Sequence, residues 1–131
     1  MSRVYSIYTE ELLSMDTVLN LVKELGGGIG QVEGFKQGII AEGNAAIWIY
    51  YRGASIRSEL GKVEEVKKLY DINVNTEIAV DIGHDDYSDK LAASFCMDFL
   101  ERYPKSIVYT GLRFIGMTEL KDWYDAPIIE Y

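Results

Sequence analysis

Five side chains that could bind a metal ion or transfer a proton crowd one short segment of this sequence. They are Asp81, His84, Asp85, Asp86 and Asp89. Carboxylates are the ligands that Mg²⁺ and Ca²⁺ prefer in proteins, so a divalent cation held by carboxylates is one interpretation. The other is that the aspartates stabilise the start of a helix, because negative charge is favourable at the positive end of the helix dipole. The sequence favours capping, and an acidic recognition surface is compatible with it.

Other catalytic groups are scarce. His84 is the only histidine and Cys96 the only cysteine, so zinc sites built from Cys and His pairs are absent. Cys96 lies on an apolar helical stripe, and its spacing from His84 does not indicate a catalytic pair, so we interpret it as a small buried residue. We therefore expect a non-enzymatic protein with no catalytic residue, no metal and no cofactor.

A glycine-rich segment spans Gly26–Gly34. Phosphate-binding loops of this composition follow a strand and open a helix, so that backbone N–H groups meet the anion. These glycines instead follow a predicted helix, and no Gly-Lys-Ser/Thr motif completes the pattern. We interpret the segment as a helix end followed by a flexible loop.

The acidic segment lies between a predicted strand and a predicted helix. Apolar residues alternate along Thr76–Ile82, which is the period of a strand. Those that follow recur every three or four positions, which predicts a helix that Asp86 or Ser88 can cap and that ends before Pro104. Ser106–Tyr109 predicts a further strand, and the unit is long enough to cross over between parallel strands.

Similar patterns place the remaining elements. They predict a weak strand at Arg3–Tyr8, a helix at Glu10–Leu25 capped by Thr9, strands at Phe35–Ala41 and Ala45–Arg52 joined by the turn Glu42–Asn44, a helix after Ser58, and a short helix from Met117 or Thr118 to Tyr124. Ala45–Tyr51 is apolar on both faces, which is typical of a central strand covered on both sides. We predict a single α/β or α+β domain, residues 1–131, with a mixed sheet of four or five strands and helices packed on it.

The charge balance limits the classes of partner. With 13 basic and 21 acidic residues, the net charge is −8. Such a field repels nucleic acid and anionic lipid and attracts a basic partner, although ordinary solubility explains the same value. No apolar run approaches the roughly 20 residues of a membrane span, and Met1–Glu10 lacks the features of a signal peptide. We therefore expect a cytoplasmic protein that binds neither nucleic acid nor membranes.

Aromatic residues accompany the acids. Tyr and Trp anchor protein interfaces because they bring large, rigid, amphipathic area. The candidate partner-binding residues are those in two clusters that combine acids and aromatics: Asp85, Asp86, Tyr87, Asp89, Asp122, Trp123, Tyr124 and Asp125. Tyr131 is a further candidate. At each site a local role remains open, since the aspartates can cap helices and Trp123 can fill the core.

With its length, its acidic balance, the strand Trp48–Tyr51 after a hairpin and the clusters Asp85–Asp89 and Asp122–Asp125, the chain resembles the small immunity proteins that bacteria encode beside polymorphic or contact-dependent inhibition toxins. The resemblance covers the whole chain and is one of format. It implies a non-catalytic protein that binds one cognate toxin domain, often a basic nuclease, and blocks its active site or substrate surface.

Two alternatives remain open from the sequence. One is a small enzyme or ligand-binding domain with a carboxylate site, with or without a divalent metal, near Asp81–Asp86. The other is a structural or regulatory adaptor, which differs from an immunity protein only in its partner. A toxin gene directly upstream would favour the immunity protein.

Overall fold

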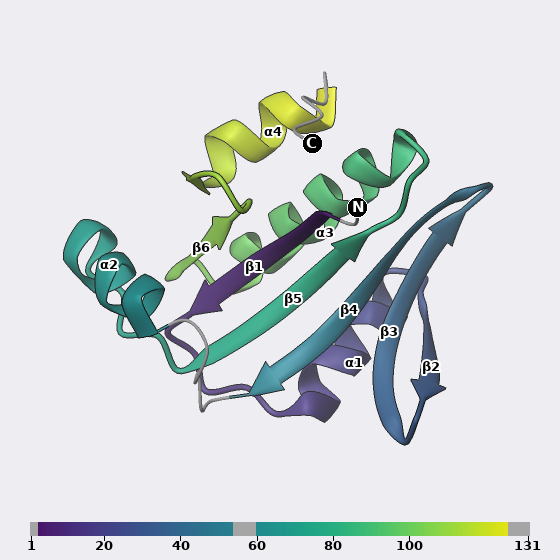
Figure 1. The fold of residues 1–131 in the computed structure, drawn as a ribbon, viewed down its shortest axis with the longest axis horizontal. Coiled ribbons are helices and arrows are strands. Elements are labelled where there is room, and N and C mark those ends of the chain that lie inside the picture. Colours follow the sequence, from purple (N-terminus) through teal and green to yellow (C-terminus); the bar gives the residue numbers. More distant parts are fainter. Residues whose placement is uncertain (1–2, 54–59, 126–131) are drawn as a thin grey trace.

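The computed structural model describes residues 3–53 and 60–125, and Figure 1 shows their arrangement. In chain order the elements are β1 (Arg3–Thr9), α1 (Met15–Glu24), β2 (Gly28–Val32), β3 (Phe35–Glu42), β4 (Ala45–Gly53), α2 (Leu60–Tyr70), β5 (Thr76–Ile82), α3 (Tyr87–Arg102), β6 (Ser106–Tyr109), β7 (Phe114–Ile115) and α4 (Met117–Asp125). The α+β class expected from the sequence is confirmed. None of these helices is long and apolar enough to cross a membrane.

The strands join one sheet in the order β2-β3-β4-β5-β1-β6-β7, and neighbouring strands are antiparallel throughout. Both β5 and β6 run opposite to β1, so they are parallel to each other. Helix α3 connects them and crosses over β1, as Figure 1 shows. The crossover that the length of this segment predicts is therefore present, with one strand inserted between its two ends.

The expected mixed sheet of four or five strands is wrong, because the described residues form seven strands with antiparallel neighbours. One added strand is the two-residue β7. The other, β2, occupies part of the glycine-rich segment that we interpreted as a flexible loop. Glu33 (φ 51°) and Gly34 (φ 84°) make a tight turn that pairs Val32 with Phe35, and such turns match the twist of the flanking strands. Backbone pairing with β3, rather than apolar alternation, makes this segment a strand.

Helix α1 begins later than the sequence pattern predicts. Its N-cap is Ser14, whose hydroxyl accepts a hydrogen bond from the backbone N–H of Thr17 at 3.2 Å. Thr9, the expected cap, is buried as the last residue of β1, where it pairs with Thr76 of β5. Because its backbone belongs to the sheet, the helix can start only after a further connection.

Helices α1 and α3 cover one face of the sheet, the side behind it in Figure 1. The central strands direct their most deeply buried apolar side chains into this layer: Ile7, Ile47, Ile49, Ile78 and Val80. Helix α4 packs against α3 and extends the same core. Helix α2 lies at one end of the sheet, where Val66 packs with Tyr8 in a second, smaller cluster.

The other face of β4 carries no helix from the part of the chain that the structure describes (Figure 1). On the helix-covered side Ile47 and Ile49 are fully buried, whereas Tyr50 on the other side is 36% exposed and Trp48 is half-buried. For the described residues, the expectation that this strand is covered on both sides is therefore wrong. Its second face carries aromatic rings, which are amphipathic and tolerate contact with water.

Candidate functional site

The start of α3 and the end of α4 lie side by side, although they are far apart in the sequence. The Lys90 ammonium of α3 stands 5.4 Å from the ring centroid of Tyr124 in α4. The Glu42 carboxylate, at the end of β3, raises the pKa of the Tyr87 phenol, and Tyr124 adds to this effect. Three elements therefore meet around Tyr87.

Two exposed tyrosines form the centre of this surface. Tyr87 is 40% exposed and Tyr124 is 39% exposed. Exposed carboxylates from the same three elements accompany them. We call the group the acidic–aromatic face and define it as Glu42, Asp85, Asp86, Tyr87, Tyr124 and Asp125.

The first turn of α3 has a defined cap. Asp85 Oδ1 accepts a hydrogen bond from the backbone N–H of Tyr87 at 2.9 Å. Asp86 occupies the N-cap position but makes no side-chain capping bond. Ser88, the other expected cap, uses its Oγ to accept from the Ala46 N–H at 3.0 Å, which ties the helix to β4. Capping is therefore the role of Asp85, and the Asp86 carboxylate stays directed to solvent.

Asp89 is not part of the exposed surface. Its side chain is 3% exposed and forms a two-point ion pair with the guanidinium of Arg3, in which Nη2 and Oδ2 are 2.9 Å apart. A carboxylate and a guanidinium paired in this way satisfy each other's charge and geometry. The pair fastens the first residue of β1 to the first turn of α3 and so holds the acidic–aromatic face in place.

Trp123 is also directed inward, in agreement with the core role that the sequence left open. It is 7% exposed, its ring lies 6.0 Å from that of Tyr5, and the Arg113 guanidinium lies 5.4 Å from its ring. Asp122 is exposed. Around α4, Asp122 lies about 200° from Tyr124, on the opposite side, whereas Asp125 follows Tyr124 directly and lies about 100° from it, at the border of the acidic–aromatic face. Tyr131 lies outside the described residues.

A pocket of about 360 Å³ opens on the uncovered side of the sheet, next to this face. Its lining comes from the β3–β4 turn, β4, the end of β5 and the turn before α3: Asn44, Ala46, Trp48, Asp81, Ile82, Gly83, His84 and Asp85. Asp81 pairs directly with Trp48 across the strands. Burial raises the pKa of the Asp81 carboxyl, against the opposing effects of the Ile82 backbone and His84.

This geometry does not support a divalent metal at the carboxylate site near Asp81–Asp86. Across residues 3–53 and 60–125, no three His, Cys, Asp or Glu side chains converge in a group that could hold a metal ion. Cys96 is fully buried, and its burial raises the thiol pKa far above the ordinary value, so it is unsuited to act as a nucleophile.

Sequence reasoning missed two contributors. The sequence pattern places Glu42 only in a turn and Trp48 only in a strand covered on both sides. The hairpin could have indicated the position of Glu42. Its register pairs Glu42 with Ala45 and so places Glu42 at the same end of the sheet as the acidic turn. For Trp48 the signal was its aromatic type on the second face of β4.

Comparisons with known proteins give no relative. No protein-family model, no curated protein and no solved structure matches the chain.

Proposed function

We propose that this protein is a non-catalytic binding protein that neutralises a basic protein partner, most plausibly a toxin domain, as bacterial immunity proteins do. The observation that carries the proposal is the acidic–aromatic face. Two exposed tyrosines, Tyr87 and Tyr124, come together from α3 and α4 and are accompanied by exposed carboxylates from three elements.

The mechanism we propose is occlusion. Carboxylates such as Asp86 and Asp125 pair with the Lys and Arg side chains that the partner uses for its own anionic substrate. Charge complementarity of this kind speeds association and sets specificity more than it sets affinity. The tight contact must then come from buried anchors, and Tyr87 and Tyr124 supply them.

The scaffold favours such a role because the face is built from packed elements. The Arg3–Asp89 pair, the bond from Ala46 to Ser88 and the packing of α4 on α3 hold its parts in one arrangement. A preorganised surface loses little conformational freedom on binding, so more of the contact energy appears as affinity.

The test is capture of the partner from the source cell with the full chain as bait. Asp86→Lys reverses a charge on the face, and Glu11→Lys is the matched control: Glu11 is exposed and lies beyond the opposite end of β1. Both variants carry the same net charge. We expect wild type and Glu11→Lys to retain a basic protein that Asp86→Lys loses.

Association rates at two salt concentrations then separate the mechanism from simple adhesion. Wild-type association should slow as salt rises, and Asp86→Lys should be slower and less sensitive to salt. Tyr124→Ala should chiefly speed dissociation. A captured partner that is acidic, or whose binding ignores salt, would refute the proposal. An adaptor is distinguished by its partner, because only a toxin inhibitor protects a cell that expresses the partner.

A further inference from the structure

The lining of the pocket beside the acidic–aromatic face includes the partly buried carboxylate of Asp81, whose hydrogen bonding is incomplete. Asp81 Oδ1 is shielded from solvent and has no hydrogen-bond partner within the described part of the chain. Buried polar atoms are nearly always paired, so an exception calls for an explanation. The cross-strand neighbours of Asp81 are Val4 and Trp48, and Oδ1 accepts a bond from neither.

The rest of the lining indicates what kind of group would complete this site. Trp48 contributes the aromatic ring type that attracts cations most strongly. Asp85 adds a second carboxylate, and among the described lining residues His84 alone is able to carry positive charge. The charge of Asp81 also reaches along the open face, since it adds to the effect of burial in raising the pKa of Tyr50. An anion would be repelled here, and a neutral apolar group would leave the charge of the Asp81 carboxylate uncompensated.

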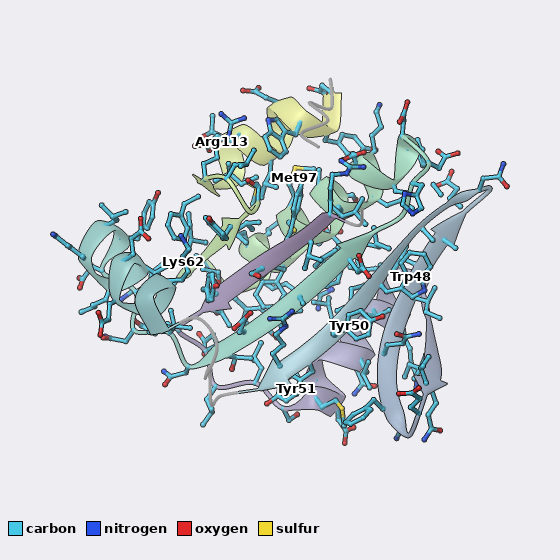
Figure 2. The ribbon with its side chains drawn as sticks, in the orientation of Figure 1. Trp48, Tyr50, Tyr51, Lys62, Met97 and Arg113 are labelled. Carbon is cyan, nitrogen blue, oxygen red and sulfur yellow. The ribbon has the colours of Figure 1, made fainter. Side chains whose placement is uncertain are left out.

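The size of the pocket and its access from solvent also suit such a group. The pocket volume of about 360 Å³ is many times the roughly 30 Å³ that one water molecule occupies in the liquid. Figure 2 shows Trp48 and Tyr50 on β4, on the side of the sheet opposite α1 and α3. An extended side chain with a charged end can therefore enter from solvent.

We infer that the pocket formed by Trp48, Asp81 and Asp85 binds an organic cation, a guanidinium or alkylammonium group. The N–H groups of the cation donate to the Asp81 carboxylate on its pocket side, and its charge lies against the Trp48 ring. A guanidinium matches this combination best, because its planar set of donors fits a carboxylate and stacks on aromatic rings.

Two sources could supply such a group: an Arg or Lys side chain of a protein partner, or a free small cation. Asp85 belongs both to the pocket and to the acidic–aromatic face, so a partner on that face lies within reach of the pocket. The protein source rests on the proposed function. The chemistry of the pocket does not, because it follows from Asp81 and Trp48 alone.

The first experiment uses the full chain and two small probes. N-acetyl-arginine methylamide carries the cation, and N-acetyl-citrulline methylamide has nearly the same shape without the charge. Each is titrated while the indole N–H signal of Trp48 is followed by NMR, with the buried Trp123 as an internal reference. We expect a saturable shift of the Trp48 signal with the arginine probe and at least a tenfold weaker response to citrulline.

Variants assign the effect to the carboxylate. Asp81→Asn should weaken binding of the arginine probe at least tenfold, whereas Asp122→Asn, which removes an exposed charge outside the pocket, should leave it unchanged. Equal responses to both probes, no saturable response, or an unchanged affinity in Asp81→Asn would overturn the inference. Should Asp81→Asn fail to fold, the comparison of the two probes on the wild-type chain still decides.

Capture of the partner distinguishes a partner side chain from a free small cation as the ligand. It also tests the pocket separately from the proposed function. If Asp81→Asn also weakens capture of a basic protein, the cation is a partner side chain. If it binds the probe weakly but captures the partner normally, the pocket serves a free cation. If the arginine probe fails while Asp86→Lys still loses the partner, the pocket inference is wrong and the proposed function stands.

Discussion

The ion pair between Arg3 and Asp89 should be one of the larger single contributions to stability. The Asp89 side chain is 3% exposed and the Arg3 side chain 13%. Asp89→Asn keeps the size of the side chain but removes the carboxylate charge that pairs with Arg3. Removing one partner of a buried pair typically costs about 3–5 kcal/mol. Because Arg3 retains some contact with water, we expect the lower end, about 3 kcal/mol.

Urea denaturation followed by circular dichroism measures this loss. With a slope of about 1.5 kcal/mol/M, a loss of about 3 kcal/mol lowers the midpoint by about 2 M. Asp86→Asn is the matched control, since it changes an exposed aspartate at the same helix end and should alter stability by less than about 0.5 kcal/mol. Adding Arg3→Met to Asp89→Asn removes the charge that Asp89 no longer balances and should restore about half of the loss.

The Asp89→Asn variant also shows whether Asp89 supports the acidic–aromatic face or contacts the partner itself. If Asp89 only positions the face and does not contact the partner, the folded fraction of Asp89→Asn should show the same salt dependence of association as wild type. A loss below about 1 kcal/mol, or no recovery with Arg3→Met, would refute the reasoning. It would mean that water stabilises the separated Arg3 charge far more than the low exposure of the two side chains indicates.

Asp81→Asn should stabilise the free protein by about 1 kcal/mol at neutral pH. Burial raises the folded-state pKa of Asp81. The wild type therefore keeps its full stability below the unfolded-state pKa and loses part of it as pH rises through the folded-state pKa. Melting curves of both proteins at acidic and neutral pH should show that the variant becomes the more stable protein as pH rises. Trp123→Ala should cost about 3–5 kcal/mol, whereas Tyr124→Ala should cost under about 1 kcal/mol, and a reversed order would show that α4 is packed differently. Gly83→Ala should destabilise the protein in thermal melts, because a Cβ there would lie 2.8 Å from the Ala46 carbonyl oxygen. Mg²⁺, Mn²⁺ and Ca²⁺ should leave the melting temperature unchanged, and a rise with any of them would revive the metal site, since a ligand that binds only the native state must raise it.

Local pattern was enough to place most of the elements. Strand β5 matches the alternation in Thr76–Ile82, and the turn at Gly43 and Asn44 joins β3 to β4 as its residue types predict. These features depend on neighbours within a few positions, where the period of apolar residues and the backbone freedom of glycine decide the outcome. Strand β2 depends instead on pairing with β3, so its own composition, rich in glycine, indicated a loop.

For the site, the sequence determined which residue types gather and the tertiary structure decided which of them face solvent. Both acidic and aromatic clusters were evident in the sequence, but Asp86 and Asp89 have the same chemistry, and so in large part do Trp123 and Tyr124. Adjacent helical positions differ by about 100°, so the side on which a helix packs determines their exposure. Helix α3 turns Asp89 toward Arg3, and α4 turns Trp123 toward Tyr5. Only this packing leaves Asp86 and Tyr124 at the surface, because the burial of one helical side fixes the exposure of the other.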